Sequence, residues 1–439
     1  MSQISLSDKK RGSKSYAKYL ECERYILSIP RFSAKKHSLA DLRDFLNELG
    51  NPHKGKKIIH VAGTNGKGSV CAYLHAILRA SGLTAGLFTS PHLVEMRERI
   101  KINDRIIALE EFIWAFETVK EKIKDFHPTF FEFLFLMAML CFGKTKLQYL
   151  ILETGLGGRL DATNVIDEKI LTIITPVSYD HMEYLGTALG QIAAEKAGIM
   201  RPGVTLLTAS QKAEVLGVLK EKAAENDVPI VPINKNAIKI NKITSKSIDF
   251  SYQYRYDIVV RILLMTKALY QAENASLAIH AALCLGDDCV STDSITSGLG
   301  QAVWPGRMEE IAPDIIIDAA HNEAGILAFI ESVRLIPRKG RKFLLFGGAK
   351  DKQSQKIVAI IKEAKLFDEI IACQMNNPRT LLKGDLAELF PPGQIFTNVE
   401  SGLASLLKQK QAGDLIFITG SLFLYSDLKL LLADEVTDD

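Results

Sequence analysis

The residues best suited to chemistry lie in the stretch IIHVAGTNGKGS, from Ile58 to Ser69. An apolar run leads into a glycine-rich turn, and the following VCAYLHAILRA has apolar residues at helical spacing. A strand, a glycine loop and a helix together let backbone N–H groups and a helix N-terminus bind phosphate. Lys67 would neutralise the outer phosphates, and the hydroxyl of Ser69 could hold a magnesium ion. The spacing departs from the common form, because Gly68 follows the lysine and Val61 replaces a glycine.

Polar residues also follow three other apolar runs that read as strands. Ser90 ends one, Glu153 ends the next, and Asp180 with His181 follows a third. Each alone has a structural reading: a serine before proline is often a turn residue, a glutamate before glycines can end a strand, and a lone histidine is often structural. Ligands of doubly wound sheets bind beyond the carboxyl ends of the strands, so convergence beside the glycine loop favours a site. Hydroxyl, carboxylate and phosphate oxygens would suit magnesium.

The elements that must position these residues alternate between strand and helix. This rhythm predicts a doubly wound, mostly parallel α/β sheet. Residues 228–260 carry short β-prone runs, as in a small antiparallel extension, and GLGQAVWPG (298–306) suits a hinge. We therefore expect an ATP-binding P-loop domain at 1–300 and a smaller Rossmann-like α/β domain at 301–439. Expected strands are 58–62, 85–89, 148–152, 170–175, 204–208, 315–319, 342–346, 368–372 and 415–419, and expected helices are 15–28, 39–49, 110–126, 130–142, 187–198, 212–225 and 271–285.

Composition places the chain among soluble globular proteins, with 47% apolar and 24% charged residues in 439. A net charge of +3 is too small to argue for nucleic acid. The six cysteines form no CxxC pair, and the polar start of the chain lacks the core of a signal peptide. The apolar run Phe130 to Phe142 contains Glu132 and is too short to span a bilayer, so it reads as a buried helix. We expect a cytoplasmic monomer with no nucleic-acid or membrane partner.

Several motifs in this order resemble one known family. They are GTNGKGS, TSPHL, ETGLGGRLDATN, DHxxxLG, EKAGI, WPGR at 304–307 and DAAHN at 318–322. Together they resemble the folylpolyglutamate synthase and dihydrofolate synthase family, within the Mur-ligase superfamily of ATP-dependent amide ligases. The resemblance extends from about Ser15 to about Tyr425.

The resemblance implies a reaction in which ATP phosphorylates a carboxylate of a folate or of dihydropteroate. The amine of L-glutamate then attacks the acyl phosphate, and phosphate leaves. Such catalysis depends mainly on positioning and on charge neutralisation. Magnesium, expected as two ions, is the implied cofactor, and ATP is the co-substrate.

The resemblance also implies roles for particular residues. Lys67, His181 and Lys196 would be catalytic, with Lys196 matching a lysine that is carbamylated in this family. Ser90, Glu153 and His181 would be metal ligands. The implied ATP-binding residues are Gly63, Thr64, Asn65, Gly66, Lys67, Gly68, Ser69, Asn274, Arg307, Asp318 and His321.

On the substrate side, Phe131 matches an aromatic residue that stacks on the pterin ring, and it reads equally well as core. Arg97 would flank the same pocket. Lys350 and Asp351 would suit the glutamate substrate. Because Arg307, Asp318 and His321 follow the expected hinge, the resemblance implies that both domains contribute to ATP binding.

Three other functions stay open from the sequence. One is a cell-wall precursor ligase of the same superfamily, which GLGGRLDATN disfavours. Another is a P-loop phosphotransferase that forms no amide, which WPGR and DAAHN in a second domain disfavour. The last is a nucleotide-binding regulator without catalysis, which the combination of Lys67, Glu153 and His181 disfavours.

Overall fold

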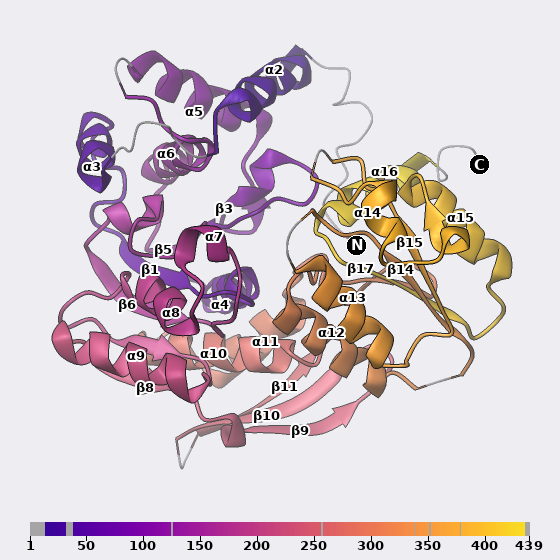
Figure 1. The fold of residues 1–439 in the computed structure, drawn as a ribbon. Coiled ribbons are helices and arrows are strands. Elements are labelled where there is room, and N and C mark those ends of the chain that lie inside the picture. Colours follow the sequence, from indigo (N-terminus) through magenta and orange to yellow (C-terminus); the bar gives the residue numbers. More distant parts are fainter. Residues whose placement is uncertain are drawn as a thin grey trace. The chain divides into compact units, whose positions relative to one another are not determined.

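The computed structural model describes residues 14–31, 38–123, 126–255, 258–337, 339–350, 353–377 and 379–434 (Figure 1). Contacts divide the chain into two compact units. The first comprises Met1–Val177, Leu185–Ile233 and Leu277–Gly298, and the second comprises Ser178–Tyr184, Asn234–Ser276 and Leu299–Asp439. Whether residue 300 separates two independent domains stays a prediction.

The first unit is built on an eight-stranded sheet with the order β4-β3-β2-β5-β1-β6-β7-β8. The strands β2, β5, β1, β6, β7 and β8 run parallel, and β3 and β4 are antiparallel at one edge. This arrangement confirms the expected doubly wound, mostly parallel sheet. The strands are β1 (Lys57–Ala62), β2 (Ala85–Phe88), β3 (Ile100–Ile102), β4 (Arg105–Ile106), β5 (Tyr149–Glu153), β6 (Lys169–Ile174), β7 (Leu206–Thr208) and β8 (Ile230–Pro232).

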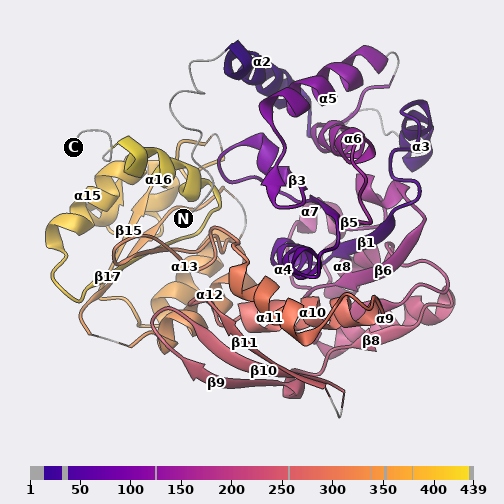
Figure 2. The same cartoon turned by 180° about the vertical axis from the view of Figure 1, so that it is seen from behind.

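Helices pack around this sheet and contribute most of its largest apolar cluster. Figures 1 and 2 show α2, α3, α5 and α6 gathered together beside β1 and β5. The helices up to the three-stranded sheet are α2 (Lys14–Ser28), α3 (Leu39–Glu48), α4 (Lys67–Ala80), α5 (Leu109–Lys122), α6 (Phe130–Gly143), α7 (Met182–Leu185), α8 (Leu189–Ala197) and α9 (Ala213–Glu225).

Helix α6 confirms the interpretation of the long apolar run. Thr129 caps its N-terminus: its side chain accepts from the Glu132 N–H, and the Glu132 carboxylate accepts from the Thr129 N–H. All residues from Phe133 to Phe142 are buried. A helix that is apolar on all sides belongs inside a core. No helix in the described part of the chain is long and apolar enough to cross a membrane.

The second unit contains two sheets. The three-stranded sheet has the order β11-β10-β9 with antiparallel pairing, which confirms the antiparallel extension. The six-stranded sheet has the order β12-β13-β17-β14-β15-β16, parallel except for the edge strand β12. The strands are β9 (Ile238–Ile243), β10 (Ile248–Arg255), β11 (Ile258–Leu264), β12 (Glu309–Ala312), β13 (Ile315–Ile317), β14 (Lys342–Phe346), β15 (Glu369–Cys373), β16 (Ile395–Phe396) and β17 (Leu415–Thr419).

Helices cover both faces of the six-stranded sheet, with α12 and α13 on one face and α15 and α16 on the other (Figures 1 and 2). This confirms the smaller α/β architecture expected for the C-terminal part. The remaining helices are α10 (Gln271–Cys284), α11 (Thr292–Gln301), α12 (Glu323–Leu335), α13 (Ser354–Glu363), α14 (Lys383–Ala387), α15 (Val399–Gln409) and α16 (Phe423–Asp434).

Helix α11 continues through Gln301 into the expected hinge at 298–306, and the division between the two units falls after Gly298, so the hinge stays a prediction. Gly298 lies against α4, where a Cβ would come within 2.7 Å of the Ala76 carbonyl oxygen. This glycine therefore allows two helices to approach closely. Only residues 302–306 of the stretch lie outside the helix.

Candidate active site

The phosphate-binding loop lies between β1 and α4, as the sequence predicts. Gly63 has φ +144°, and a Cβ at this position would lie 1.9 Å from the Thr175 hydroxyl oxygen. Gly66 is the N-cap of α4 with φ +88°. The Thr64 N–H donates to the Pro176 carbonyl at 3.0 Å, which ties the loop to the segment after β6. Two glycines thus supply backbone conformations that side chains would obstruct.

Two side chains of this loop are placed for phosphate chemistry. Lys67 is the first residue of α4, and its Nζ donates to the Thr64 carbonyl at 3.2 Å. Ser69 is 1% exposed, and its Oγ has no hydrogen-bond partner in the described part of the chain. A buried hydroxyl without a partner is energetically costly, so this orphaned Oγ indicates a ligand atom beside it.

Lys196 lies in α8 and reaches the same loop. Its side chain is 3% exposed, and Nζ donates to the Gly63 carbonyl at 2.7 Å. Sequence reasoning implied Lys196 only through resemblance, and its location beside the loop adds a physical role. This hydrogen bond connects α8 to the loop where Gly63 takes its unusual backbone conformation.

Ser90 and Glu153 lie together at the same edge of the sheet. Strands β2 and β5 are parallel neighbours, so the residues that end them lie side by side. The Ser90 N–H donates to Glu153 Oε2 at 2.9 Å, and Glu153 is 2% exposed. Strand β5 also pairs with β1, which leads into the phosphate-binding loop. Oxygen donors suited to a divalent cation are therefore grouped within the first unit.

Asp318 organises the site residues of the second unit. Its carboxylate accepts from the Tyr270 hydroxyl at 2.5 Å, from the Met308 N–H at 3.0 Å and from the Ala320 N–H at 2.9 Å. Burial raises the pKa of Asp318, and the charge of Arg307 and these hydrogen bonds oppose that rise. The carboxylate thus holds the backbone next to Arg307.

Other contacts shape the turn that presents Arg307. Gly306 and Met308 both have positive φ, and the Gly306 N–H donates to Glu309 Oε2 at 2.7 Å. The Ala319 N–H donates to the Gly306 carbonyl at 2.9 Å. The motifs WPGR and DAAHN are therefore two parts of one structure. Tyr270 was missed from the sequence, and no motif singled it out.

Three further predicted residues lie in the second unit. His181 has φ +48°, and its N–H donates to Asp180 Oδ1 at 2.9 Å. His321 contacts the Ala319 carbonyl through Nδ1 at 2.9 Å. Asn274 is buried in α10, and its Nδ2 donates to Gln271 Oε1 at 2.8 Å. Asp180 also accepts from the Asn322 amide at 3.2 Å, which connects His181 to the DAAHN segment.

The predicted residues thus form two groups. The first unit holds residues 63–69 together with Ser90, Glu153 and Lys196, and the second holds Asn274, Arg307, Asp318, His181 and His321. Whether His181 shares a metal with Ser90 and Glu153 stays a prediction. No group of three His, Cys, Asp or Glu residues among those described has metal-binding geometry. Lys350 Nζ lies 3.8 Å from Asp385 Oδ1. Asp351 is outside the described residues.

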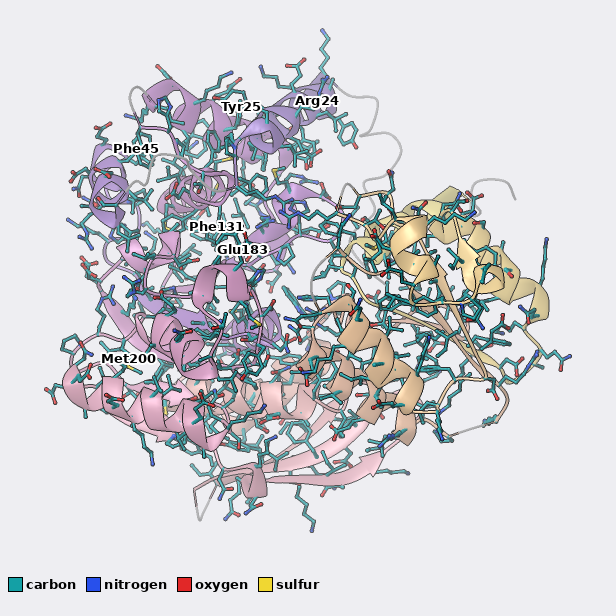
Figure 3. The ribbon with its side chains drawn as sticks, viewed as in Figure 1. Arg24, Tyr25, Phe45, Phe131, Glu183 and Met200 are labelled. Atoms are coloured by element: carbon teal, nitrogen blue, oxygen red, sulfur yellow. The ribbon has the colours of Figure 1, made fainter. Side chains whose placement is uncertain are left out.

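The pterin-side residues have different surroundings. Figure 3 labels Phe131 together with Tyr25 of α2 and Phe45 of α3. A Cβ on Gly155 would lie 2.7 Å from the Phe131 ring, and the Phe88 ring centroid is 5.5 Å away. Phe131 is half-buried, so the position fits both a stacking platform and a core contact.

Arg97 is engaged on all sides by its own chain. Its Nε and Nη2 donate to Glu95 Oε2 at 3.0 and 2.7 Å, and its Nη1 donates to the Ile107 carbonyl at 2.7 Å. The guanidinium also lies over the Tyr19 ring, 5.8 Å from its centroid. These contacts suit a structural role, and the expectation that Arg97 binds folate stays a prediction.

A buried polar network underlies the GLGGRLDATN motif. The Thr163 hydroxyl donates to Asp161 Oδ1 at 2.5 Å and lies 2.7 Å from His60 Nε2. Lys169 Nζ donates to Asn164 Oδ1 at 2.6 Å and to the Ile199 carbonyl at 3.0 Å. Burial, together with the charge of Arg201, lowers the pKa of Lys169 to about 6. The motif's last residues are therefore structural, which sequence spacing could not indicate.

Comparison with known families agrees with this architecture. The family model of the Mur ligase middle domain matches residues 61–282, and that of the Mur ligase glutamate ligase domain matches residues 306–422. The fold and the phosphate-binding loop therefore define a Mur-type ligase.

Individual relatives narrow the class. The chain is 31% identical to the dihydrofolate synthase/folylpolyglutamate synthase of Bacillus subtilis over 94% of this chain and 99% of that protein. It is 29% identical to the folylpolyglutamate synthase of Lacticaseibacillus casei over 94% and 98% of the two chains. The chain belongs to the folylpolyglutamate synthase and dihydrofolate synthase family.

Solved structures show the same fold. The Mycobacterium tuberculosis folylpolyglutamate synthase complexed with ADP has a TM-score of 0.86 at 27% identity, covering 95% of this chain and 99% of that one. Escherichia coli FolC in complex with DHPP and ADP has a TM-score of 0.84 at 25% identity, covering 96% and 99%. The predicted family and fold class are confirmed.

Proposed function

We propose that this protein is an ATP-dependent ligase that adds L-glutamate to a folate-type carboxylate, giving ADP and phosphate. The observation that carries the proposal is the orphaned hydroxyl of Ser69 at the start of α4, in a loop that Lys67 and Lys196 contact. This is the arrangement that an anionic nucleotide tail requires. Relatives named as folylpolyglutamate synthases match almost the whole chain. Their names support a folate as the molecule that is extended and glutamate as the amino acid that is added.

The first unit also contains residues that fit magnesium. Ser69, Ser90 and Glu153 offer two hydroxyl oxygens and a carboxylate, all of them oxygen donors as magnesium prefers. We infer that these residues would hold the ion, with His181 as a further ligand and with a second ion near the acyl phosphate. Magnesium would supply neutralisation of phosphate charge during transfer.

The chain's own residues orient the reactants. Loop N–H groups and Lys67 bind the β- and γ-phosphates, and Lys196 keeps the loop in place through Gly63. A substrate carboxylate oxygen attacks the γ-phosphorus, the bond to the bridging oxygen breaks, and ADP departs. The glutamate amine then attacks the acyl carbon and loses a proton, and inorganic phosphate leaves. Arg307 and the residues around Asp318 assist nucleotide binding.

The acceptor is either dihydropteroate, a folate that already carries glutamate, or both. An assay of ADP release in the presence of glutamate, with dihydropteroate and tetrahydrofolate compared, distinguishes these cases. We expect release with at least one acceptor and none without glutamate. ADP release that is independent of glutamate would instead indicate a phosphotransferase. Monomeric state, cytoplasmic location and carbamylation of Lys196 stay predictions.

The Lys67→Ala variant tests the phosphate-binding loop. Loss of its charge leaves phosphate charge uncompensated in the transition state, so turnover should fall by about 10² to 10³-fold. The measurement is the rate of ADP release at saturating acceptor. Lys54→Ala, an exposed lysine before β1, is the matched control and should behave like the unmodified protein. Unchanged turnover in Lys67→Ala would contradict the assignment.

A further inference from the structure

Two arginines of the same short segment have opposite environments. Arg97 and Arg99 are 7% and 6% exposed, so both guanidinium groups are buried. Arg97 has partners for its Nε and for both Nη groups. Arg99 donates only through Nε, to His92 Nδ1 at 2.9 Å. Arg99 therefore keeps both Nη groups without a partner in the described part of the chain.

The charge of Arg99 has no directly paired carboxylate among the described residues. Burial lowers the pKa of Arg99 to about 10; the charges of Glu153 and Glu98 act against this shift from beyond ion-pair distance, and the charge of Arg31 adds to it. His92 accepts through Nδ1, so that nitrogen carries no proton, and the Phe130 ring centroid lies 5.4 Å from the guanidinium carbon. A buried cation without a directly bonded carboxylate is costly, so an anion that binds the guanidinium would complete the site.

The backbone fixes Arg99 beside the predicted site. The Thr89 N–H donates to the Arg99 carbonyl at 3.0 Å, one residue before Ser90. Strand β3 begins directly after Arg99 and pairs with β2. Phe130 precedes Phe131, whose ring packs on Gly155 just after Glu153 and Thr154. Aromatic rings and the Arg99 guanidinium therefore lie close together in this region.

We propose that Arg99 binds the carboxylate of the folate-type substrate that is to be activated, using its two Nη groups as a fork. The inference rests on the proposed function and adds the residue that holds the acceptor. The planar guanidinium matches the two oxygens of a carboxylate. Such a cation is needed because the acceptor carboxylate must approach a γ-phosphate of the same charge. His92 positions the guanidinium through Nε and leaves the other edge for the substrate.

The test compares two ligands that differ in one charge. Binding of pteroate and of its carboxamide is measured by calorimetry in the presence of magnesium and ADP. The unmodified protein should prefer pteroate by about 10- to 100-fold. Arg99→Gln should reduce the ratio of the two affinities to about one, mainly by weakening the binding of pteroate. Arg105→Gln, an exposed arginine of β4 paired with Glu111, is the matched control and should keep the full preference.

Arg99→Lys is a second variant for the case in which Arg99→Gln does not fold. It keeps the positive charge but loses the two Nη groups that would bind both carboxylate oxygens. It should show a reduced preference that still exceeds one. Either folded variant keeping the full preference would overturn the inference. Glutamate-dependent ADP release by the unmodified protein separates this result from failure of the proposed function: its absence would refute the function, whereas its presence with an unchanged preference in the variants refutes only the role of Arg99.

Discussion

At the scale of single residues, the site depends on polar groups that the fold leaves without internal partners. The buried Ser69 hydroxyl has no hydrogen-bond partner, and Arg99, a buried residue, donates through Nε alone, whereas Arg97 and Lys169 each donate to two or more internal acceptors. Burying an unpaired polar group lowers stability, so such a group beside a phosphate-binding loop fits a position where a ligand supplies the missing bond. Residue type alone does not separate these cases.

Glu153 can be tested by removing its charge while keeping its shape. Glu153→Gln should raise the magnesium concentration needed for half-maximal activity by about 10- to 100-fold, because the amide is a weaker ligand. A magnesium titration of ADP release measures this shift. Glu168→Gln, at an exposed glutamate before β6, should leave the titration unchanged. An unshifted titration in Glu153→Gln would exclude it as a ligand.

At the scale of elements, the strands place the site and buried polar contacts fix the loops around it. Lys169 opens β6 and binds Asn164 and the Ile199 carbonyl, so it fastens the GLGGRLDATN segment to the residues after α8. A buried lysine of this kind is held neutral. The free-energy cost of keeping Lys169 neutral in the folded protein therefore depends on pH.

The pH dependence follows from the pKa of Lys169, which burial lowers from 10.5 to about 6. Between these values the unfolded chain binds a proton that the folded chain does not, so the free energy of unfolding rises with pH. Lys169→Met removes this contribution, although it also removes two hydrogen bonds. As pH rises through this window, the free energy of unfolding of the unmodified protein should increase relative to that of the variant by up to about 1.4 kcal/mol per pH unit. Urea unfolding at several pH values in this window measures the difference.

The exposed Lys220 of α9 offers a matched control for that experiment. Lys220→Met should unfold with the same pH dependence as the unmodified protein. Parallel stability curves for Lys169→Met and the unmodified protein would show that Lys169 is charged in the folded state, and the interpretation would be wrong.

At the scale of the whole molecule, residues of the second unit should matter to nucleotide use. Arg307→Ala should lower kcat/KM for ATP by about 10²-fold, since the proposed contact of Arg307 with phosphate would be lost. Tyr270→Phe should produce a smaller loss of the same kind, because it loosens Asp318 and the turn beside Arg307. Steady-state kinetics with varied ATP measures both. Arg334→Ala, at an exposed arginine of α12, is the control, and unmodified kinetics in Arg307→Ala would contradict the role.

Much of this fold could be predicted because its signals are local. Long apolar runs and the glycine loop gave β1, β5, β14, β17 and α6 nearly to the residue. The short strands β3, β4 and β12 were missed, because two to four residues carry little periodicity. The close approach of α11 to α4 at Gly298 could not be predicted, because it depends on packing between segments distant in sequence. Tyr270 and Arg99 depend on contacts distant in sequence, which spacing cannot encode.

The N-terminal helices deserve notice in any attempt to shorten the protein. Residues of α2 and α3, among them Cys22, Ile26, Leu42 and Phe45, are buried in the same cluster as α5 and α6, and Phe131 packs against it. They precede residue 61, where the matched middle domain begins. A recombinant fragment that begins at that boundary would expose a large apolar surface next to Phe131. Such a fragment should aggregate on expression, so the domain as families define it is smaller than the unit that folds.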